Sequence, residues 1–194
     1  MNSDKLEDIV NGIQNCTEWC RDYNFAPLTH AGIESKILVV TQEPSYSAFK
    51  EGVMISCSTW FDLLFWLGFS MEDSQIAEAY FCWTQTCNCY FHDRKKLEEA
   101  RRHCTNTWLL PLMASANPEL LITFGKKAAD VFNLSLPGCG ELTNVKTGTR
   151  MKCYSLYHPS PRNFKNYSEK PDMYKDQRQV ALALRDDIRQ ILYG

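Results

Sequence analysis

The stretch KILVVTQEPS, residues 36–45, joins a run of apolar and β-branched residues to an abrupt polar end. Such a run is typical of a strand buried in a sheet, and Pro44 ends it because proline cannot donate to a strand ladder. Gln42, Glu43 and Ser45 therefore lie in or beside the loop that follows. Ligands of open α/β sheets bind beyond the carboxyl ends of the strands, so this loop is a candidate site.

Three further runs have the same character, namely Ala79–Trp83, Glu119–Phe124 and Met151–Tyr157. Between the runs, apolar residues recur at spacings of three and four, which predicts helices. The expected helices are Lys5–Tyr23, Thr59–Leu67, Arg94–Ala114, Lys126–Phe132 and Asp176–Leu192. Strands alternating with helices predict an α/β fold, a three-layer α/β/α sandwich around a central, mainly parallel four-stranded sheet. The length predicts a single domain over residues 1–194.

Composition narrows the setting in which the protein works. No stretch approaches the roughly 20 apolar residues of a membrane span, and the start, MNSDKLED, has no basic segment of the kind that opens a secretory signal. We therefore expect a cytoplasmic protein. The formal net charge of -2 gives no general attraction to nucleic acid. Basic residues occur in four local groups, namely Arg94, Lys95 and Lys96, then Arg101 and Arg102, then Lys126 and Lys127, then Arg162 and Lys165. We interpret the first two groups as a solvated helix face.

A second loop follows the last predicted strand, in LYHPSPRNF, residues 156–164. Taken with ILVVTQEPSY, it resembles the two signature loops of uracil-DNA glycosylases, which usually read Gly-Gln-Asp-Pro-Tyr and His-Pro-Ser-Pro-Leu. The segment WLLPLMASANPELLITFGKKAADVF, residues 108–132, is similar to a helix–strand–helix block of the iron–sulfur branch of that superfamily. The resemblance covers about Cys16–Phe164 and implies an enzyme that hydrolyses base–sugar bonds in DNA as a monofunctional glycosylase.

The resemblance implies catalytic roles for Glu43 and His158. Breaking a glycosidic bond builds positive charge on the sugar and negative charge on the base. Glu43, an aspartate in the usual loop, would orient water beside the sugar, and His158 would donate a hydrogen bond to the base. The backbone N–H of Gln42 would hold a base carbonyl. Read alone, Glu43 is an ordinary surface acid and His158 a structural histidine; the two loops together favour catalysis.

Base recognition departs from the family pattern. Trp83 stands where the family has an asparagine that reads uracil, and its single N–H donor cannot replace the amide's paired contacts. Ser45 replaces the tyrosine that blocks C5-substituted pyrimidines. Met54 or Ile55 occupies the region of the base-stacking aromatic, although either is equally a core residue. We therefore expect the enzyme to excise a modified pyrimidine, such as a C5-substituted one, at least as readily as uracil. The biological setting would be base-excision repair or defence against phage DNA.

The second loop also carries the expected DNA contacts. Arg162 stands at the position of the leucine that fills the gap left by a flipped base, and a cationic wedge is one way to fill it. A flexible surface loop is the alternative interpretation. The resemblance implies DNA as the partner of a monomeric protein, with contacts from Pro159, Ser160, Arg162, Asn163, Phe164 and Lys165.

Nine cysteines in such a chain favour reduced thiols or a metal site over a disulfide framework. Their arrangement resembles the iron–sulfur branch, which implies a [4Fe–4S] cluster on Cys16, Cys20, Cys104 and either Cys87 or Cys89. Zinc, or no metal at all, is the alternative. We expect the remaining cysteines to pack as small apolar residues; they are Cys57, Cys82, Cys139 and Cys153.

Two other functions remain open on the sequence. A catalytically divergent nucleic-acid-binding protein with the glycosylase fold would account for Trp83 at the position of the asparagine. A flavodoxin-like or nucleotide-binding protein is a weaker alternative, because the chain has neither a Gly-x-Gly-x-x-Gly motif nor a Walker loop.

Overall fold

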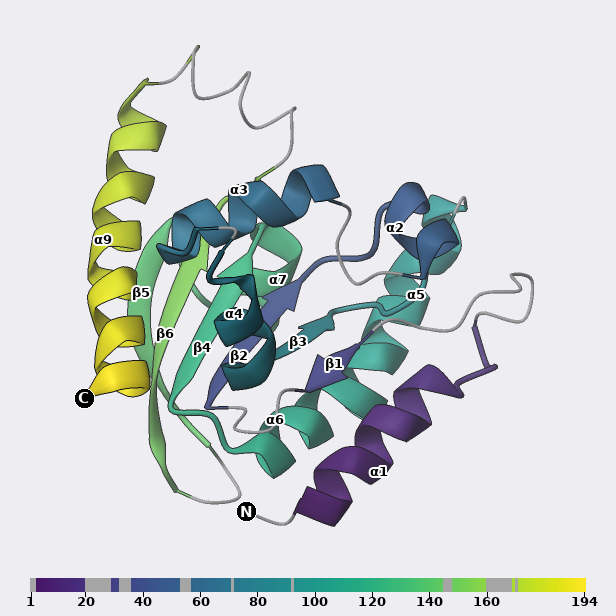
Figure 1. The fold of residues 1–194 in the computed structure, drawn as a ribbon. Coiled ribbons are helices and arrows are strands. Elements are labelled where there is room, and N and C mark those ends of the chain that lie inside the picture. The colour runs from purple at the N-terminus through teal and green to yellow at the C-terminus, as the bar shows by residue number, and fades with distance from the viewer. Residues whose placement is uncertain are drawn as a thin grey trace.

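A computed structural model describes residues 3–19, 29–31, 36–52, 57–70, 72–91, 93–144, 148–159, 169 and 171–194. The described strands form one six-stranded sheet with the order β1-β3-β2-β4-β6-β5 (Figure 1). Their bounds are β1 His30–Ala31, β2 Ile37–Thr41, β3 Phe81–Gln85, β4 Leu120–Phe124, β5 Gly138–Thr143 and β6 Arg150–Leu156. The four runs that the sequence marks as strands are all present.

The central strands β3, β2, β4 and β6 are parallel, as predicted, and an antiparallel strand extends the sheet at each edge. Strand β1 pairs only His30 and Ala31 with β3. Strand β5 has the sequence GCGELT, largely exposed and containing two glycines. Because neither edge strand has an apolar run, the sequence predicted four strands where the structure has six.

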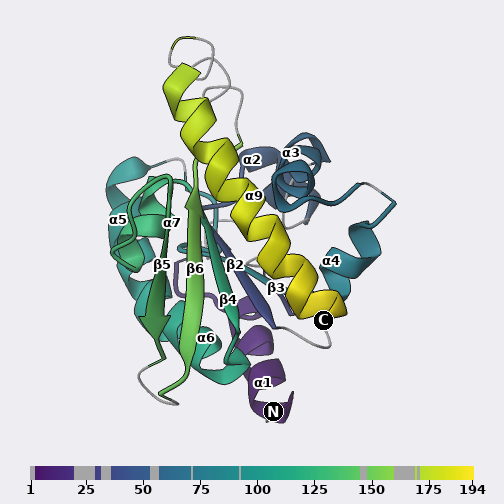
Figure 2. The ribbon, with the colours of Figure 1, turned by 90° about the vertical axis from the view of Figure 1, so that its left-hand side faces the viewer.

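Helices cover both faces of the sheet and confirm the three-layer α/β/α arrangement (Figures 1 and 2). Helices α3, α4 and α9 pack on one face, and α1, α6 and α7 on the other. The helix bounds are α1 Ser3–Gln14, α2 Tyr46–Glu51, α3 Cys57–Leu67, α4 Ser74–Tyr80, α5 Arg94–Cys104, α6 Leu110–Ala116, α7 Lys126–Val131 and α9 Pro171–Tyr193, with a π-helical segment η1 at Thr105–Leu109.

Several predicted elements have different bounds in the structure. The helix predicted over Arg94–Ala114 is divided by η1, which precedes Pro111; a proline has no N–H to continue a regular helical ladder. The strand predicted over Ala79–Trp83 begins at Phe81, because Tyr80 completes α4. It continues to Gln85, which pairs with Thr41 of β2. Helix α1 ends at Gln14, earlier than the apolar spacing predicted.

The apolar core lies in two layers, one on each face of the sheet. Phe81, Phe124 and Leu156 point toward α3 and α9, whereas Leu38 and Leu121 point toward α1 and α6. Each such side chain is fully buried, and burial of this kind contributes about 1.5–3 kcal/mol per residue. The alternation along each strand therefore holds the sheet between both helical layers.

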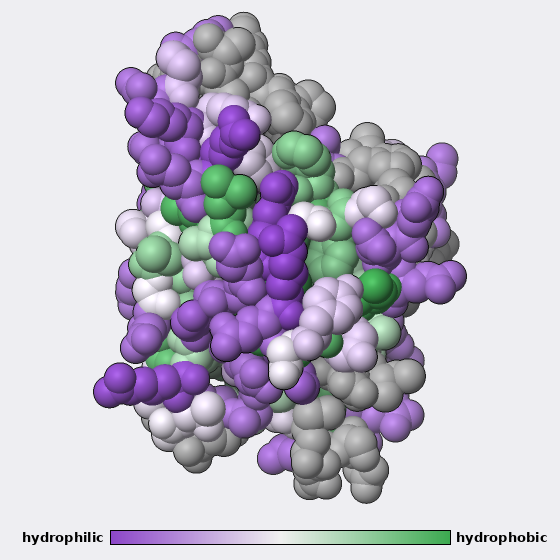
Figure 3. Space-filling model, turned by 60° about the vertical axis from the view of Figure 1, so that its left-hand side comes forward, coloured by the Kyte–Doolittle hydropathy of each residue, from purple (hydrophilic) through white to green (hydrophobic). Residues whose placement is uncertain are grey.

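Helix α9 crosses the sheet diagonally in Figure 2 and is fastened to β6 by a polar contact. Tyr154 donates from Oη to Asp187 Oδ2 at 2.6 Å, and Lys152 donates from Nζ to Asp187 Oδ1 at 2.7 Å. On the face shown in Figure 3, hydrophilic residues predominate and the hydrophobic areas between them are small. Within the described ranges, no helix has the length and apolar character to cross a membrane.

Candidate active site

The loops after β2 and β3 are joined beyond the carboxyl edge of the sheet. The amide of Thr86 donates to the carbonyl of Thr41 at 2.9 Å, and that of Cys87 donates to Gln42 at 3.1 Å. The hydroxyl of Thr86 donates to the same Gln42 carbonyl at 2.6 Å. The pairing of β2 with β3 thus continues past the strand ends, and it places Glu43 beside the start of the β3–α5 segment.

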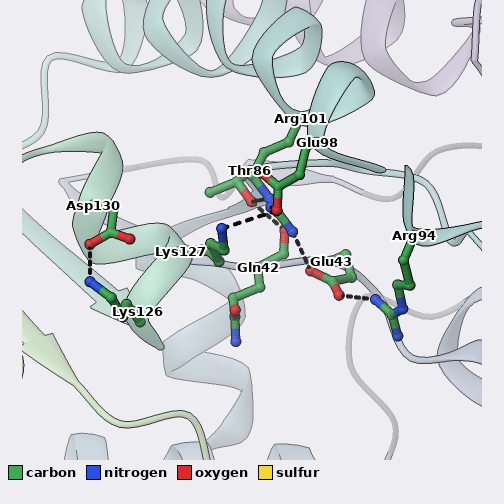
Figure 4. A network of polar contacts seen from close by, with 9 residues as sticks. All are labelled: Gln42, Glu43, Thr86, Arg94, Glu98, Arg101, Lys126, Lys127 and Asp130. Carbon is green, nitrogen blue, oxygen red and sulfur yellow. Dashed lines mark hydrogen bonds and ion pairs between the residues drawn. The ribbon is translucent and has the colours of Figure 1, made fainter. Parts of the chain in front are cut away.

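Two arginines of α5 hold the carboxylate of Glu43 (Figure 4). Arg94 donates from Nη1 to Oε1 at 2.7 Å, and Arg101 donates from Nη2 to Oε2 at 3.1 Å. The Glu43 side chain is 19% exposed, that of Arg94 is 66% exposed and that of Arg101 only 8% exposed. Each carboxylate oxygen therefore has its own guanidinium, one exposed to solvent and the other buried.

Arg101 connects Glu43 to the rest of the edge. Its Nε donates to Oγ1 of Thr86 at 3.2 Å, and its Nη1 donates to Oε1 of Glu98 at 2.5 Å. Lys127 of α7 reaches the same Glu98 oxygen at 3.0 Å. Burial opposes the charged form of Arg101, but its hydrogen bond to Glu98 and the charge of Glu43 raise its pKa above the ordinary value. The buried guanidinium stays charged and holds three segments together.

His158 comes two residues after β6 and is half-buried. Burial lowers the pKa of its imidazole below the ordinary value, and the negative charge of Glu43 opposes this shift. Glu43 is therefore near enough for its charge to act on His158. Strands β2 and β6 are separated by β4 alone, about 10 Å at ordinary strand spacing. The two predicted catalytic residues therefore follow strands β2 and β6 at the same edge of the sheet.

Gln42 closes this edge against the β4–α7 turn. Gly125 has φ +91°, which only glycine adopts readily, and a Cβ built there would lie 2.5 Å from Nε2 of Gln42. The amide of Gly125 donates to the carbonyl of Leu156 at 2.8 Å. The absence of a side chain at Gly125 leaves room for the Gln42 amide, so the loops after β2 and β4 pack together.

Ser45 has a structural contact in addition to its predicted place in the base pocket. It is the N-cap of α2, and its Oγ accepts a hydrogen bond from the amide of Ala48 at 3.1 Å. Its side chain is exposed. The first loop therefore turns directly into a helix, which carries Tyr46 outward beside it.

Trp83 lies in the core, which argues against its predicted place at the base. It pairs with Val39 in the middle of the sheet, is 2% exposed and packs against Phe81 with ring centroids 5.5 Å apart. The sequence placed it at the strand end because β3 was expected to stop there; the strand continues to Gln85. Trp83, which the resemblance aligns with the family's asparagine, is therefore a core residue in this structure.

Asn88 is a buried polar residue beside the end of β3. Its Oδ1 accepts hydrogen bonds from the hydroxyl of Thr84 and the amide of Gln85, both at 3.2 Å. Its Nδ2 is buried and has no hydrogen-bond partner among the described residues. A buried donor of this kind is costly unless a ligand or water satisfies it. Asn88 is thus a candidate contact to a ligand, and the sequence analysis did not predict it.

Several predicted contacts lie outside the described residues. Of the second loop, the structure describes His158 and the buried Pro159, which follows it directly. The remaining predicted residues lie outside the described ranges; they are Met54, Ile55, Ser160, Arg162, Asn163, Phe164, Lys165 and Cys20.

The structure brings Cys87, Cys89 and Cys104 into one buried cluster with Phe91, Leu97 and Ala100. A hydrogen bond between the Cys87 and Cys104 thiols raises the pKa of Cys87 and lowers that of Cys104. Cys89 is disulfide-bonded, so the expectation of reduced cysteines fails there, whereas Cys16, Cys87 and Cys104 are free thiols. The expected apolar packing is confirmed for the buried Cys82 and Cys153 and is wrong for Cys139, which is exposed on the edge strand β5.

The segment after α1 packs on α5 beside this cluster. Glu18 lies 3.1 Å from Nε2 of His103, and the Trp19 ring lies 6.2 Å from the His103 ring, measured between centroids. Cys104 is the next residue after His103. Within the described ranges, no three His, Cys, Asp or Glu side chains converge as a metal site. Glu18 and Trp19, which contact α5, lie in the sequence between the two N-terminal cysteines that were predicted as ligands.

The arginine pair is the part of the site that the sequence analysis missed. We interpreted Arg94 and Arg101 as a solvated charge run. They are seven residues apart, two helical turns, and so lie on one face of α5 together with the buried Leu97 and Cys104. That spacing, beside an acidic loop, was the available signal.

The fold and this edge define an α/β protein with an acid and a histidine beyond the carboxyl ends of parallel strands, where ligands of such sheets bind. A comparison with protein families matches residues 29–182 to the family described as "Uracil DNA glycosylase superfamily". The chain belongs to this superfamily. A comparison with curated proteins finds no significant match.

Proposed function

We propose that the protein is a monofunctional DNA glycosylase, which flips a pyrimidine out of DNA and hydrolyses its N-glycosidic bond. The observation that supports this most strongly is the position of Glu43 and His158, which follow two strands of one sheet edge and lie within electrostatic reach of each other. The family match over residues 29–182 supports the same class of reaction.

In this proposal Glu43 acts on the sugar. As the glycosidic bond breaks, its electron pair leaves with the base and C1′ becomes positively charged. A carboxylate held in place by Arg94 and Arg101 stabilises that charge and orients the water whose oxygen bonds to C1′. Because Arg101 is buried, it holds the Glu43 carboxylate in position before the reaction begins, so the carboxylate does not have to rearrange during the reaction.

His158 acts on the base. Burial favours its neutral form, which still carries one N–H. That N–H donates to the pyrimidine oxygen on which negative charge develops. The attacking water leaves its hydroxyl on C1′, and its other proton ends on the departing base. Atoms and charges therefore balance without a covalent enzyme intermediate.

The proposed substrate is a modified pyrimidine, such as a C5-substituted one, or uracil. Ser45, at the position of the blocking tyrosine, is small and exposed. Trp83, at the position of the uracil-reading asparagine, is a buried tryptophan and does not supply the amide that selects uracil. The amide N–H of Asn88 is an available donor beside β3. The biological setting that we propose is base-excision repair or defence against phage DNA, carried out in the cytoplasm by a monomer.

Mass spectrometry of released bases tests the activity directly. Purified protein is incubated with uracil-containing, hypoxanthine-containing and phage-modified DNA, and free bases are identified. We expect release of a pyrimidine, reduced at least about a hundredfold in Glu43→Gln and in His158→Ala. Glu51→Gln, an exposed acid of α2, is the matched control and should retain the wild-type rate.

Other outcomes identify what has failed. Release of uracil without any C5-modified pyrimidine would remove the proposed substrate class and leave the reaction in place. DNA binding without release of any base would support the catalytically divergent nucleic-acid-binding protein instead.

We also propose that Cys16, Cys20, Cys87 and Cys104 bind a [4Fe–4S] cluster, with zinc as the alternative. Support comes from the free, hydrogen-bonded thiols of Cys87 and Cys104 in a buried cluster. The contact between Glu18 and His103 holds the segment after Cys16 against α5. The disulfide at Cys89 favours Cys87 as the third ligand. Such a group would hold the N-terminal segment on α5 and has no part in base release.

Metal analysis of anaerobically purified protein tests this ligand set. We expect a brown protein with about four iron atoms per chain. Cys104→Ser should lose the metal and the visible absorbance, whereas Cys139→Ser, at the exposed cysteine of β5, should retain both. Stoichiometric zinc in place of iron would establish the alternative, and metal-free protein in both variants and wild type would contradict the proposal.

A further inference from the structure

A partly exposed aromatic pair lies beside the candidate active site. Tyr46 begins α2 directly after the first loop and is 50% exposed. Tyr90 lies between β3 and α5, and the two ring centroids are 5.4 Å apart with an interplanar angle of 55°. Aromatic rings this close stabilise each other, yet a large part of Tyr46 still faces solvent. The pair presents an aromatic surface at the rim of the site.

Arg94, the first residue of α5, follows Tyr90 closely in the chain. The segment containing Glu43 and Tyr46 is cross-linked twice to the segment containing Tyr90 and Arg94, once by the ion pair at 2.7 Å and once by the ring pair. All four residues therefore lie on two segments that are joined at this edge of the sheet. In this ion pair the Arg94 side chain is 66% exposed and that of Glu43 is 19% exposed, so an incoming anion can reach the guanidinium from solvent and compete with Glu43 for it.

Another exposed aromatic residue shows the contrast. Phe65 is 59% exposed and has the guanidinium of Arg185 5.3 Å from its ring centroid. Arg185, however, donates to the backbone carbonyls of Trp66 and Phe65, so it fastens α9 to α3. Arg94 has no such backbone contact among the described residues and can turn to a ligand.

We propose that Tyr46, Tyr90 and Arg94 bind the nucleotide adjacent to the flipped one. Its base stacks on the exposed ring of Tyr46, which Tyr90 supports, and its phosphate pairs with Arg94. Aromatic stacking combined with a cation is how proteins hold single-stranded nucleic acid without reading its sequence. The proposal rests on the glycosylase function above, and it adds a subsite that determines how the strand lies across Glu43. A phosphate on Arg94 also releases Oε1 of Glu43, which is then available to orient water.

Fluorescence anisotropy with product-like DNA tests the subsite independently of the excised base. The probe is a labelled single-stranded 15-mer with one central tetrahydrofuran abasic site. We expect Tyr46→Ala to weaken binding about five- to a hundredfold, as loss of one stacked base does, and Tyr46→Phe to bind as wild type. Tyr174→Ala, at an exposed tyrosine of α9, is the matched control and should have no effect.

A second tetrahydrofuran, placed on the 5′ or the 3′ side of the first, removes the neighbouring base. On one side it should weaken wild-type binding by the same factor as Tyr46→Ala and should not weaken Tyr46→Ala further. Arg94→Gln should reduce the slope of log Kd against log salt by about 0.7. Equal binding by wild type and Tyr46→Ala, or fully additive losses, would overturn the subsite.

These outcomes separate the subsite from the enzyme. Normal base release together with an unaffected Tyr46→Ala variant contradicts the subsite alone. A wild-type protein that neither binds the probe nor releases any base contradicts the glycosylase proposal, and the subsite with it.

Discussion

Arg101 donates from Nη2 to Oε2 of Glu43 at 3.1 Å, joining a buried cation of α5 to the acid that follows β2. The two residues are far apart in the chain and meet only because β2 and β3 are neighbours in the sheet. This contact, with that of Arg94, fixes the direction of the carboxylate. The pair is therefore the first place to test how the fold prepares the site.

Removing Arg101 should affect both stability and activity. Arg101→Ala leaves the partly buried Glu43 with one partner and deletes the hydrogen bond to Thr86, so we expect a loss of about 3 kcal/mol in the free energy of unfolding. Urea unfolding followed by circular dichroism measures this loss. Arg102→Ala, at the exposed neighbour, should cost less than about 0.5 kcal/mol. Partial recovery of base release in Arg101→Lys would show that charge at this position matters; equal losses in both alanine variants would contradict the prediction.

Gly125 should be needed for the position of Gln42. Gly125→Ala introduces a methyl group 2.5 Å from Nε2 of Gln42 at a backbone conformation that disfavours alanine. We expect slower base release and a loss of about 1–3 kcal/mol in stability. Gly52→Ala is the matched control, because Gly52 also has positive φ, +69°, but no atom within 4 Å of the added Cβ. It should lose stability and keep the wild-type rate. Full activity in Gly125→Ala would show that Gln42 is not held by this turn.

The stability of the protein should depend on pH through His158. Burial lowers its pKa in the folded state, so the unfolded state binds more protons as the pH falls below about 6.5. The free energy of unfolding therefore decreases with falling pH in this range, and stability is restored above it. We expect His158→Gln to reduce the difference in urea midpoint between pH 7 and pH 5. An unchanged difference in His158→Gln would contradict the assignment.

The contact between Tyr154 and Asp187 should hold α9 on the sheet. Tyr154→Phe removes the 2.6 Å hydrogen bond, and we expect a cost of about 1–2 kcal/mol. Tyr193→Phe, at a tyrosine 70% exposed near the end of α9, should be neutral. Burial and the hydrogen bond to Asp187 raise the pKa of Tyr154, so the folded state keeps its proton when the unfolded state loses it. Stability should therefore fall as the pH rises above about 10, and less steeply in Tyr154→Phe than in the wild type.

How far the sequence predicted the fold depends on the kind of residue. Runs such as Ile37–Thr41 and Leu120–Phe124 are fully buried strands with few other possibilities, and their order with helices predicted the layers. The two-residue strand β1 and the glycine-containing β5 have no apolar run, because edge strands are exposed and bury little. They form by pairing with β3 and β6, which is a long-range property.

The candidate site shows the same division. The sequence by itself predicted which two loops are the candidates, because Glu43 and His158 each follow a buried strand and a proline stands next to each. Only the tertiary structure decided their partners. In the structure, Arg94 and Arg101 bind the carboxylate of Glu43, and Trp83 lies in the core. The thiols of Cys87 and Cys104 are hydrogen-bonded to each other. Local pattern reports which face of an element is buried, whereas pairing between distant side chains depends on strand order and register, which no local pattern contains.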